Sequence, residues 1–225
     1  MSFTQSYKMP PLRIRYQTIE IDRFDIHVRS LWDKQQFSDS LGEADALGIS
    51  SAQWSLFGVV WASGEVLAHE MANFPIEGKR ILEVGCGMAL SSLLLNSRHA
   101  DITATDIHPE ANNFLTENVR LNNGEKIPFL RTSWNDSCDG LGKYDVIIGS
   151  DVLYERDHID LLSNFIDQHA KPKCEIVLVD PGRSNHSSFS KKMIALGYSH
   201  TKSKPDYDNL LANTFKGHIL RYLRN

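Results

Sequence analysis

Short apolar runs alternate with longer segments of helical periodicity from residue 79 to the end of the chain. The clearest runs are residues 80–84, 144–148 and 175–179, each followed directly by glycine or aspartate. Weaker strands are predicted at residues 102–105, 127–131 and 214–223, with helices at residues 89–98, 109–124, 159–166 and 189–196. This alternation predicts an α/β, doubly wound fold with a mostly parallel sheet covered on both faces. Ligands of such sheets bind at the carboxyl ends of the strands, so the residues that follow each strand are the informative ones.

The first part of the chain has a different pattern. Residues 18–22 and 25–29 alternate apolar and polar side chains, which predicts an antiparallel hairpin with one solvent-exposed face and with Arg23 and Phe24 in its turn. Residues 31–51 are polar and aperiodic, and a helix is predicted over residues 65–74. We therefore divide the chain into an N-terminal hairpin and loop extension, residues 1–55, and a main domain, residues 56–225.

Composition narrows the classes of partner. Hydrophobic residues make up 41% of the 225 residues and charged residues 23%, which is typical of a globular chain with a sizeable core. The net charge of −4 argues against a broad basic face for nucleic acid. No apolar stretch approaches the ~20 residues that span a bilayer, and residues 1–11 lack the apolar region of a signal peptide. We expect neither a nucleic-acid partner nor a membrane partner.

The cysteines point to a reducing compartment. Cys86, Cys138 and Cys174 are odd in number and far apart, and no Cys-x-x-Cys pair is present. The nine histidines show no metal-ligand spacing with them. We expect a reduced, cytoplasmic protein without a metal site.

The first strand of the main domain ends in the run Glu-Val-Gly-Cys-Gly-Met-Ala-Leu, residues 83–90. Gly85 and Gly87 allow a tight turn and a close approach of the backbone to a ligand. The dinucleotide fingerprint needs a glycine where Leu90 stands, which disfavours a nicotinamide oxidoreductase. An inward carboxylate of Glu83 would repel a pyrophosphate and suits a ligand with positive charge or hydrogen-bond donors. The alternative is an ordinary strand-to-helix turn.

The second strand ends in Asp106. A carboxylate at this place can accept both hydroxyls of a ribose, although it can also simply cap the helix that begins near Pro109. Taken with the acid and glycines after the first strand, Asp106 indicates a nucleoside cofactor that carries positive charge and lacks a pyrophosphate. S-adenosylmethionine has these properties.

These residues and the strand order resemble the class I, seven-stranded methyltransferases. Three further motifs resemble the lysine-methyltransferase-like family called methyltransferase family 16. They are Val-Trp-Ala-Ser-Gly around Trp61, Trp134 after the third strand, and Ser-Asp-Val-Leu-Tyr at residues 150–154. The resemblance runs from the hairpin onward. It departs from the family at Ala62, where proline is common, and at Ala89, the third small residue of the turn, and neither change removes a reactive side chain.

The resemblance implies a seven-stranded sheet with S-adenosylmethionine bound at its carboxyl edge. The implied cofactor-binding residues are Trp61, Glu83, Gly85, Cys86, Gly87, Asp106, Trp134 and Ser150. The implied catalytic residues at the mouth for the methyl acceptor are Asp151 and Tyr154. Trp134 is expected beside the adenine, where a flat apolar wall helps.

Methyl transfer to a lysine needs an unprotonated amine, which at pH 7 costs about 4–5 kcal/mol because the pKa of lysine is ~10.4. Asp151 would hold the amine by a charge-assisted hydrogen bond, and Tyr154 would stack on it. The alternative is that Asp151 caps a loop and Tyr154 is merely half-buried. We expect Arg183 at the same rim to be solvated, the alternative being that it binds an acidic group of the substrate. We expect Cys86 to be buried rather than reactive.

The favoured function is an S-adenosylmethionine-dependent N-methyltransferase acting on a protein lysine. Two alternatives stay open: methylation of a small-molecule amine or pyridine nitrogen, and a non-catalytic binding module on the same fold. Adenine methyltransferases resemble one another in an Asn/Asp-Pro-Pro-aromatic turn, and residues 150–153 contain no proline. No Gly-x-Ser-x-Gly elbow is present for a serine hydrolase. The sequence sets no oligomeric state.

Overall fold

The main sheet has seven strands. They are β3 (Arg80–Glu83), β4 (Asp101–Asp106), β5 (Phe129–Arg131), β6 (Tyr144–Ser150), β7 (Ala170–Asp180), β8 (Ser199–Ser203) and β9 (His218–Arg224). Their spatial order is β5-β4-β3-β6-β7-β9-β8, with β9 antiparallel to both of its neighbours and the other pairs parallel. This computed structural model describes residues 12–138, 140–206 and 214–225. It confirms the doubly wound, mostly parallel fold, whereas residues 1–11, on which the signal-peptide expectation rests, lie outside the described residues.

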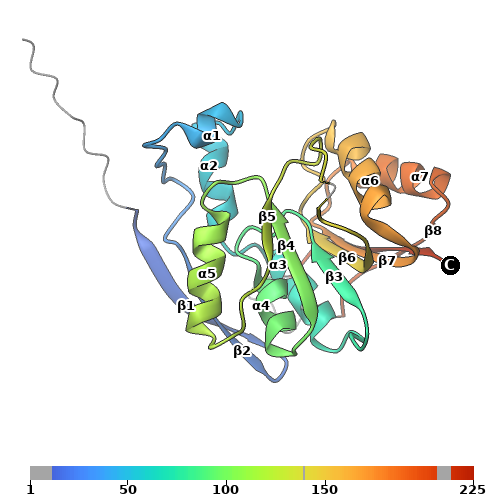
Figure 1. The fold of residues 1–225 in the computed structure, drawn as a ribbon, viewed down its shortest axis with the longest axis horizontal. Helices are drawn as coiled ribbons and strands as arrows, with labels where there is room; N and C mark the ends of the chain where they lie inside the picture. Colours follow the sequence, from blue (N-terminus) through green and yellow to red (C-terminus); the bar gives the residue numbers. More distant parts are fainter. Residues whose placement is uncertain (1–11, 139, 207–213) are drawn as a thin grey trace, which may run out of the picture.

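Helices cover both faces of this sheet (Figure 1). They are α3 (Ala62–Ala72), α4 (Leu90–Ser97), α5 (Ala111–Leu121), α6 (His158–His169) and α7 (His186–Ala195). One hydrophobic cluster joins α3, α4 and α5 to Ile81 and Ile148 of the sheet. The other joins α6 and α7 to the next residues along the strands, such as Leu82. Because alternate side chains are buried on opposite faces, the central strands contain continuous apolar runs, and these make them the clearest strands in the sequence.

The predicted hairpin is present as β1 (Ile14–Ile21) and β2 (Phe24–Leu31), an antiparallel pair that lies beside α5 at one end of the molecule (Figure 1). Its turn is one position earlier than predicted, because Ile21 pairs with Phe24 and the turn is formed by Asp22 and Arg23. Asp22 has a φ of 58°, a left-handed conformation that aspartate tolerates better than most residues.

Two asparagines of α5 attach this hairpin to the main domain. The side-chain amide of Asn122 accepts the N–H of His27 at 2.8 Å and donates to the carbonyl of the same residue at 2.7 Å. Asn118, which is fully buried, accepts the N–H of Arg29 at 2.7 Å. The side chains of α5 therefore satisfy backbone groups on the open edge of β2, as a further strand would.

The segment between hairpin and main domain contains short helices instead of continuous loop: α1 (Glu43–Ala46), α2 (Ser51–Trp54) and the 3-10 helix η1 (Ser55–Gly58). A capping box between Ser50 and Gln53 starts α2. Helix α3 begins at Ala62 rather than at residue 65 as predicted. Trp61 is still extended, so the helix follows the aromatic residue directly.

Strand β8 was missed by the sequence analysis. Its residues, Ser199–Ser203, are mostly exposed and carry no apolar side chain that would form a strand pattern. It lies at the edge of the sheet and pairs only with β9, so it forms a strand through its hydrogen bonds to β9 and not through an apolar pattern of its own.

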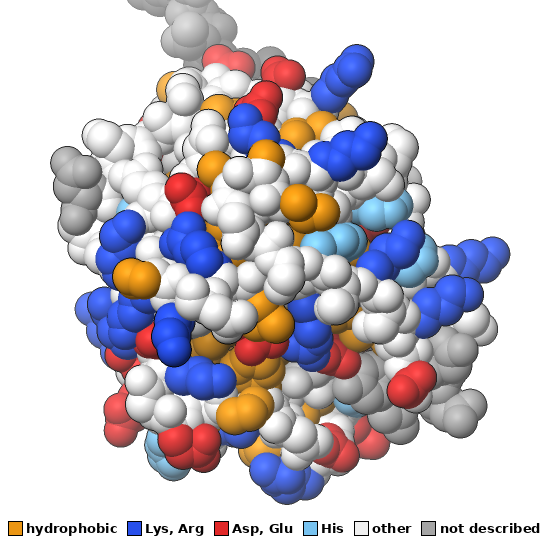
Figure 2. Space-filling view, turned by 90° about the vertical axis from the view of Figure 1, so that its right-hand side faces the viewer, with side chains coloured by type: hydrophobic (Ala, Val, Ile, Leu, Met, Phe, Trp, Pro, Cys, Tyr) orange, Lys and Arg blue, Asp and Glu red, His pale blue; other side chains and the backbone are white. Residues whose placement is uncertain are grey.

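The face with α7 and β8 carries lysine and arginine side chains dispersed among acidic and hydrophobic ones (Figure 2). Within the described part of the chain, no helix combines the length and the apolar character needed to cross a bilayer.

Replacing Asn118 by alanine should weaken the docking of the hairpin. The substitution leaves the partly buried N–H of Arg29 without an acceptor. We expect Asn118→Ala to lower the free energy of unfolding by about 1–3 kcal/mol, measured by urea denaturation. Asn113→Ala, on an exposed part of the same helix, is the control and should change stability by less than about 0.5 kcal/mol. Equal losses in the two variants would contradict this account.

Candidate functional site

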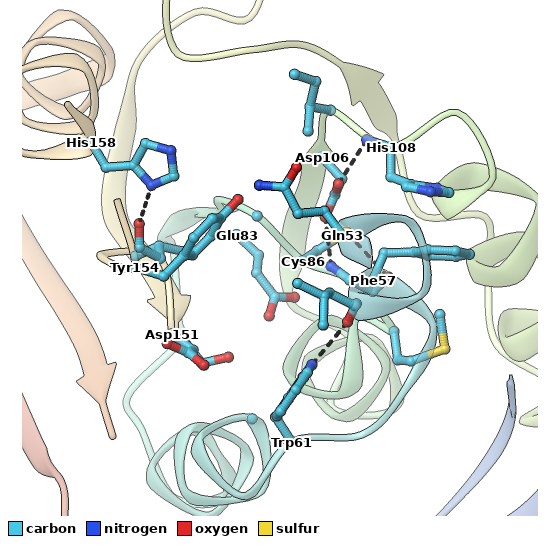
Figure 3. Close-up of a pocket in the computed structure, with 18 of the residues that line it drawn as sticks. Gln53, Phe57, Trp61, Glu83, Cys86, Asp106, His108, Asp151, Tyr154 and His158 are labelled. Carbon is cyan, nitrogen blue, oxygen red and sulfur yellow. Dashed lines mark hydrogen bonds between the residues drawn. The ribbon is translucent and has the colours of Figure 1, made fainter. Parts of the chain in front are cut away.

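A cavity of about 570 Å³ opens at the carboxyl ends of β3, β4 and β6 (Figure 3). All ten residues predicted for the site line it: Trp61, Glu83, Gly85, Cys86, Gly87, Asp106, Trp134, Ser150, Asp151 and Tyr154. The volume is in the range of small-molecule sites. The structure therefore brings the predicted residues together, and their individual roles stay predictions.

The turn after β3 depends on its two glycines. Gly85 has a φ of 60° and Gly87 a φ of 52°, a conformation that disfavours side chains. A Cβ on Gly85 would lie 3.0 Å from the side chain of Val152, and one on Gly87 would lie 3.1 Å from the carbonyl oxygen of Phe57. Glycine is thus needed for the backbone conformation and for the close packing around the cavity.

The start of α4 is occupied by a carboxylate of the chain itself. Glu83, which is 3% exposed, accepts the N–H of Ser92 at 3.1 Å and also the Ser92 hydroxyl. A helix N-terminus is the place where dinucleotide folds bind a pyrophosphate. Because Glu83 already satisfies this end of α4 and lines the cavity, a phosphate there would meet a buried acid. The arrangement disfavours anionic ligands.

Asp106 holds the same turn from the end of β4. One of its oxygens accepts the N–H of Gly87 at 2.8 Å, and the other accepts the N–H of His108 at 2.9 Å. Burial raises the pKa of Asp106, while these backbone hydrogen bonds oppose the rise. Each carboxylate oxygen has a second lone pair, so Asp106 can still accept hydroxyl groups from a ligand in the cavity.

The opposite side of the cavity carries the third predicted acid, Asp151. Asp151 directly follows β6, has a φ of 53°, and pairs with Arg183 through two hydrogen bonds of 2.5 and 2.9 Å. As expected, the Arg183 side chain is partly solvated, with 41% of its surface exposed, but it is not free of protein partners. Its guanidinium is bound to Asp151 because the turn after β7 directs it across the carboxyl edge of the sheet.

Aromatic side chains surround this pair. Tyr154 is 46% exposed, its ring lies 4.5 Å from His158, and the Arg183 guanidinium lies 5.9 Å from it. Burial of the hydroxyl region raises the pKa of Tyr154 to about 12, so the phenol stays protonated. Trp134 meets the edge of His158 at 4.8 Å. Figure 3 shows Asp151, Tyr154 and His158 on one side of the cavity, with Phe57 and His108 on the other.

Trp61 and Cys86 close further parts of the wall. The indole N–H of Trp61 donates to the carbonyl of Leu56 at 2.9 Å, and the ammonium of Lys34 lies 3.8 Å from the ring centroid. Cys86 is buried, and burial raises the pKa of its thiol well above the usual value. The prediction that Cys86 is buried is confirmed, and a protonated thiol is a poor nucleophile.

The sequence analysis missed the wall formed by Phe57 and His108. Their rings stack at 3.7 Å between centroids, and both line the cavity. Burial lowers the pKa of His108 to about 3, so its imidazole is neutral. His108 stands two positions after Asp106, so its place after β4 could have suggested that it lies near the site. Nothing in the sequence indicates that it stacks on Phe57 of η1.

Gln53 of α2 was also missed. Its side-chain amide donates to Glu155 at 3.0 Å and joins the N-terminal segment to the loop that carries Tyr154. Both residues line the cavity. The segment before the main domain therefore contributes directly to the candidate site.

The cavity thus has two buried acids and a glycine turn on one side, and an acid with aromatic side chains on the other. This pattern fits a nucleoside with positive charge better than a nucleotide with phosphates. The family model described as lysine methyltransferase matches residues 46–195, which is more than half of the chain. The chain belongs to the lysine methyltransferase family.

Two relatives of this lysine methyltransferase family member come from Mus musculus. The electron transfer flavoprotein beta subunit lysine methyltransferase is 28% identical over 151 residues, covering 65% of this chain and 57% of the relative. The EEF1A lysine methyltransferase 3 is 28% identical over 189 residues, covering 76% of this chain and 81% of the relative. The chain therefore spans little more than half the length of the first of these relatives.

A solved structure supports the fold. Magnesium protoporphyrin IX methyltransferase from Synechocystis PCC 6803 with bound SAM superposes with a TM-score of 0.56 at 20% identity. The match covers 71% of this chain and 76% of that one. At 20% identity, the similarity shows that the two proteins share a fold.

The buried carboxyl of Glu83 should make stability depend on pH. Burial raises its pKa to about 7, partly offset by the hydrogen bonds from Ser92, whereas in the unfolded chain the pKa is about 4.3. The folded state then binds more protons between these values, so the free energy of unfolding falls as pH rises through this window. We expect Glu83→Gln to be more stable than the wild type by about 1–3 kcal/mol at pH 8, and by less at pH 5.

Urea denaturation of the unliganded protein at both pH values measures this effect. Glu125→Gln, at an exposed glutamate, is the control and should change stability by less than about 0.5 kcal/mol at either pH. A Glu83→Gln protein less stable than the wild type at pH 8 would show that the ionised carboxylate is not penalised by burial.

Proposed function

We propose that the chain is an S-adenosylmethionine-dependent methyltransferase whose acceptor is the side-chain amine of a protein lysine. Membership of the lysine methyltransferase family supports the activity, and both mouse relatives are lysine methyltransferases by name. The observation that carries the proposal is the position of Glu83 at the start of α4. It gives the cavity the charge that a sulfonium nucleoside requires and that a diphosphate opposes.

The side of the cavity with Glu83, Asp106 and the glycine turn would hold the cofactor. The cofactor supplies an electrophilic methyl group on a positively charged sulfur. Asp106 would accept the ribose hydroxyls, as acids at this position of nucleoside-binding folds do. Gly85 and Gly87 would let the backbone approach the ligand, and Glu83 would face its positive charge. Trp134 would cover the adenine with a flat apolar surface.

The opposite side of the cavity, with Asp151 and Tyr154, would orient the acceptor. Asp151 would accept a hydrogen bond from the amine and so direct the nitrogen lone pair toward the methyl carbon. Tyr154 would pack against the amine and its methylated product. A nitrogen–carbon bond forms as the carbon–sulfur bond breaks, the electron pair stays on sulfur, and the excess proton leaves to solvent.

A cytoplasmic location is part of the same proposal. The three cysteines are unpaired and buried, as expected for a protein of a reducing compartment. A protein acceptor agrees with the names of the two mouse relatives. A small-molecule amine or pyridine nitrogen as acceptor, and a module that binds without catalysis, are outcomes that the following experiment separates.

Labelling of a cell lysate tests the proposal. We expect purified protein with methyl-tritiated S-adenosylmethionine to transfer label into protein, in acid-stable form on lysine after hydrolysis. Asp106→Ala should reduce labelling at least tenfold by weakening cofactor binding, whereas Asp101→Ala, an exposed aspartate of the same strand, should not. Label confined to small molecules would favour the first alternative, and no transfer despite cofactor binding would favour the second.

Asp151→Asn should distinguish the acceptor side of the cavity from the cofactor side. The substitution keeps the shape of the side chain but replaces one acceptor oxygen by an amide NH2, which can neither accept an N–H from the amine nor pair with Arg183. We therefore expect the rate of methyl transfer to fall at least tenfold. The affinity for S-adenosylhomocysteine, measured by calorimetry, should change less than threefold. Asp157→Asn, at an exposed aspartate just before α6, serves as the control. Equal losses of affinity and rate would show that Asp151 belongs to the cofactor side.

A further inference from the structure

The carboxylate proposed to receive the acceptor amine already has a cationic partner. Arg183 donates through Nε to one oxygen of Asp151 and through Nη2 to the other, a bidentate pair. The carboxylate side chain is 14% exposed and the guanidinium 41%. The hydrogen bonds to Asp151 raise the pKa of Arg183, so it stays charged at every ordinary pH.

The fold holds this arginine in place from behind. Asp180, at the end of β7, accepts the N–H groups of Gly182 and Arg183, both at 2.8 Å. Gly182 has a φ of 104°, which turns the chain toward β6. The side chain of Asp180 is buried, so the turn is anchored in the core. Arg183 is therefore presented to Asp151 by a built turn and does not reach it as a freely solvated side chain.

An unpaired carboxylate at this position would act against the proposed reaction. A negative charge within about 4–6 Å raises the pKa of an amine and keeps it protonated. A protonated amine has no lone pair and cannot attack a methyl group. A carboxylate and a guanidinium together form a pair with no net charge, while the carboxylate oxygens keep lone pairs that can accept an N–H.

We propose that Arg183 is a positioning residue that neutralises Asp151, so that the site binds the acceptor as the free amine and rejects the ammonium ion. The inference rests on the proposed function, because it assigns Asp151 to the acceptor. Arg183 acts through Asp151 and need not touch the substrate. This role also explains why the positively charged Arg183 lies at the mouth of a site proposed to take a basic substrate.

The other charged or titratable groups around the pair lie on separate elements. Tyr154, Glu155 and His158 come from the loop after β6 and the start of α6. Asp180 comes from the end of β7, and His186, at the start of α7, lies beside Asp180 and the backbone of Arg183. Glu83 and Asp106 line the same cavity from β3 and β4. The pH range from 8 to 9.5 is suited to a binding experiment, because it lies above the pKa of Glu83, about 7, and below the pKa of Tyr154, about 12.

Binding of n-butylamine, a mimic of the end of a lysine side chain, tests the inference. The protein is saturated with S-adenosylhomocysteine, and the affinity for n-butylamine is measured by ligand-observed NMR at pH 8 and pH 9.5. We expect the wild-type affinity to rise about thirtyfold, in step with the fraction of neutral amine below its pKa of ~10.4. Arg183→Gln should bind the ammonium form, and its affinity should change less than threefold.

Two variants serve as matched controls. Arg183→Lys keeps a positive charge beside Asp151 and should keep the steep pH dependence. Arg156→Gln removes an exposed arginine of the same rim and should behave as the wild type. If Arg183→Gln fails to bind S-adenosylhomocysteine, Arg183→Met provides a second neutral variant for the same comparison.

The outcomes separate the inference from the proposed function. The same pH dependence in the wild type and Arg183→Gln would overturn the role of Arg183 and leave the methyltransferase proposal standing. Absence of n-butylamine binding to the wild type at both pH values would also overturn it, because the acceptor amine would then lie elsewhere. Failure of the wild type to bind S-adenosylhomocysteine in calorimetry would overturn the proposed function itself.

Discussion

The hydrogen bonds between Glu83 and the first turn of α4 determine the chemistry of the cavity. A helix N-terminus in an α/β fold attracts anions unless the chain supplies one itself. Here Glu83 satisfies the N–H of Ser92 in α4, and Asp106 satisfies that of Gly87 in the glycine turn, so an acid of the chain already binds a backbone donor of each. The rest of the site is built around a ligand that those acids can bind.

Buried acids destabilise the fold unless they are hydrogen-bonded, and the unliganded site keeps part of this penalty in Glu83, whose pKa is raised to about 7 by burial. Helix α2, before residue 55, and the 3-10 helix η1, which begins at residue 55, help to close the space around these acids. Phe57 stacks on His108, and Gln53 bonds to Glu155 across the cavity. The division at residue 55 remains a prediction, but the segment before it contributes to the cavity wall and, through Leu31, to the main hydrophobic cluster.

Much of the fold could be predicted because the central strands are buried on both faces and therefore contain continuous apolar runs, such as residues 146–148 of β6 and 176–179 of β7. Prediction failed where tertiary contacts replaced that pattern. The edge strand β8 is polar and exists through pairing with β9. The start of α3 at Ala62 and the left-handed Asp22 in the hairpin turn depend on local backbone conformation, to which hydrophobic periodicity is blind.

The sequence by itself determined part of the site, because parallel strands bring the residues after them to one edge of the sheet. That rule indicated Glu83 and Asp106 from their positions, the family resemblance added Asp151, and all three line one cavity. Only the tertiary structure decided the partners of these acids. The pairing of Asp151 with Arg183 joins the ends of β6 and β7, and no spacing along the chain encodes a contact that depends on the angle of a turn and the reach of a side chain.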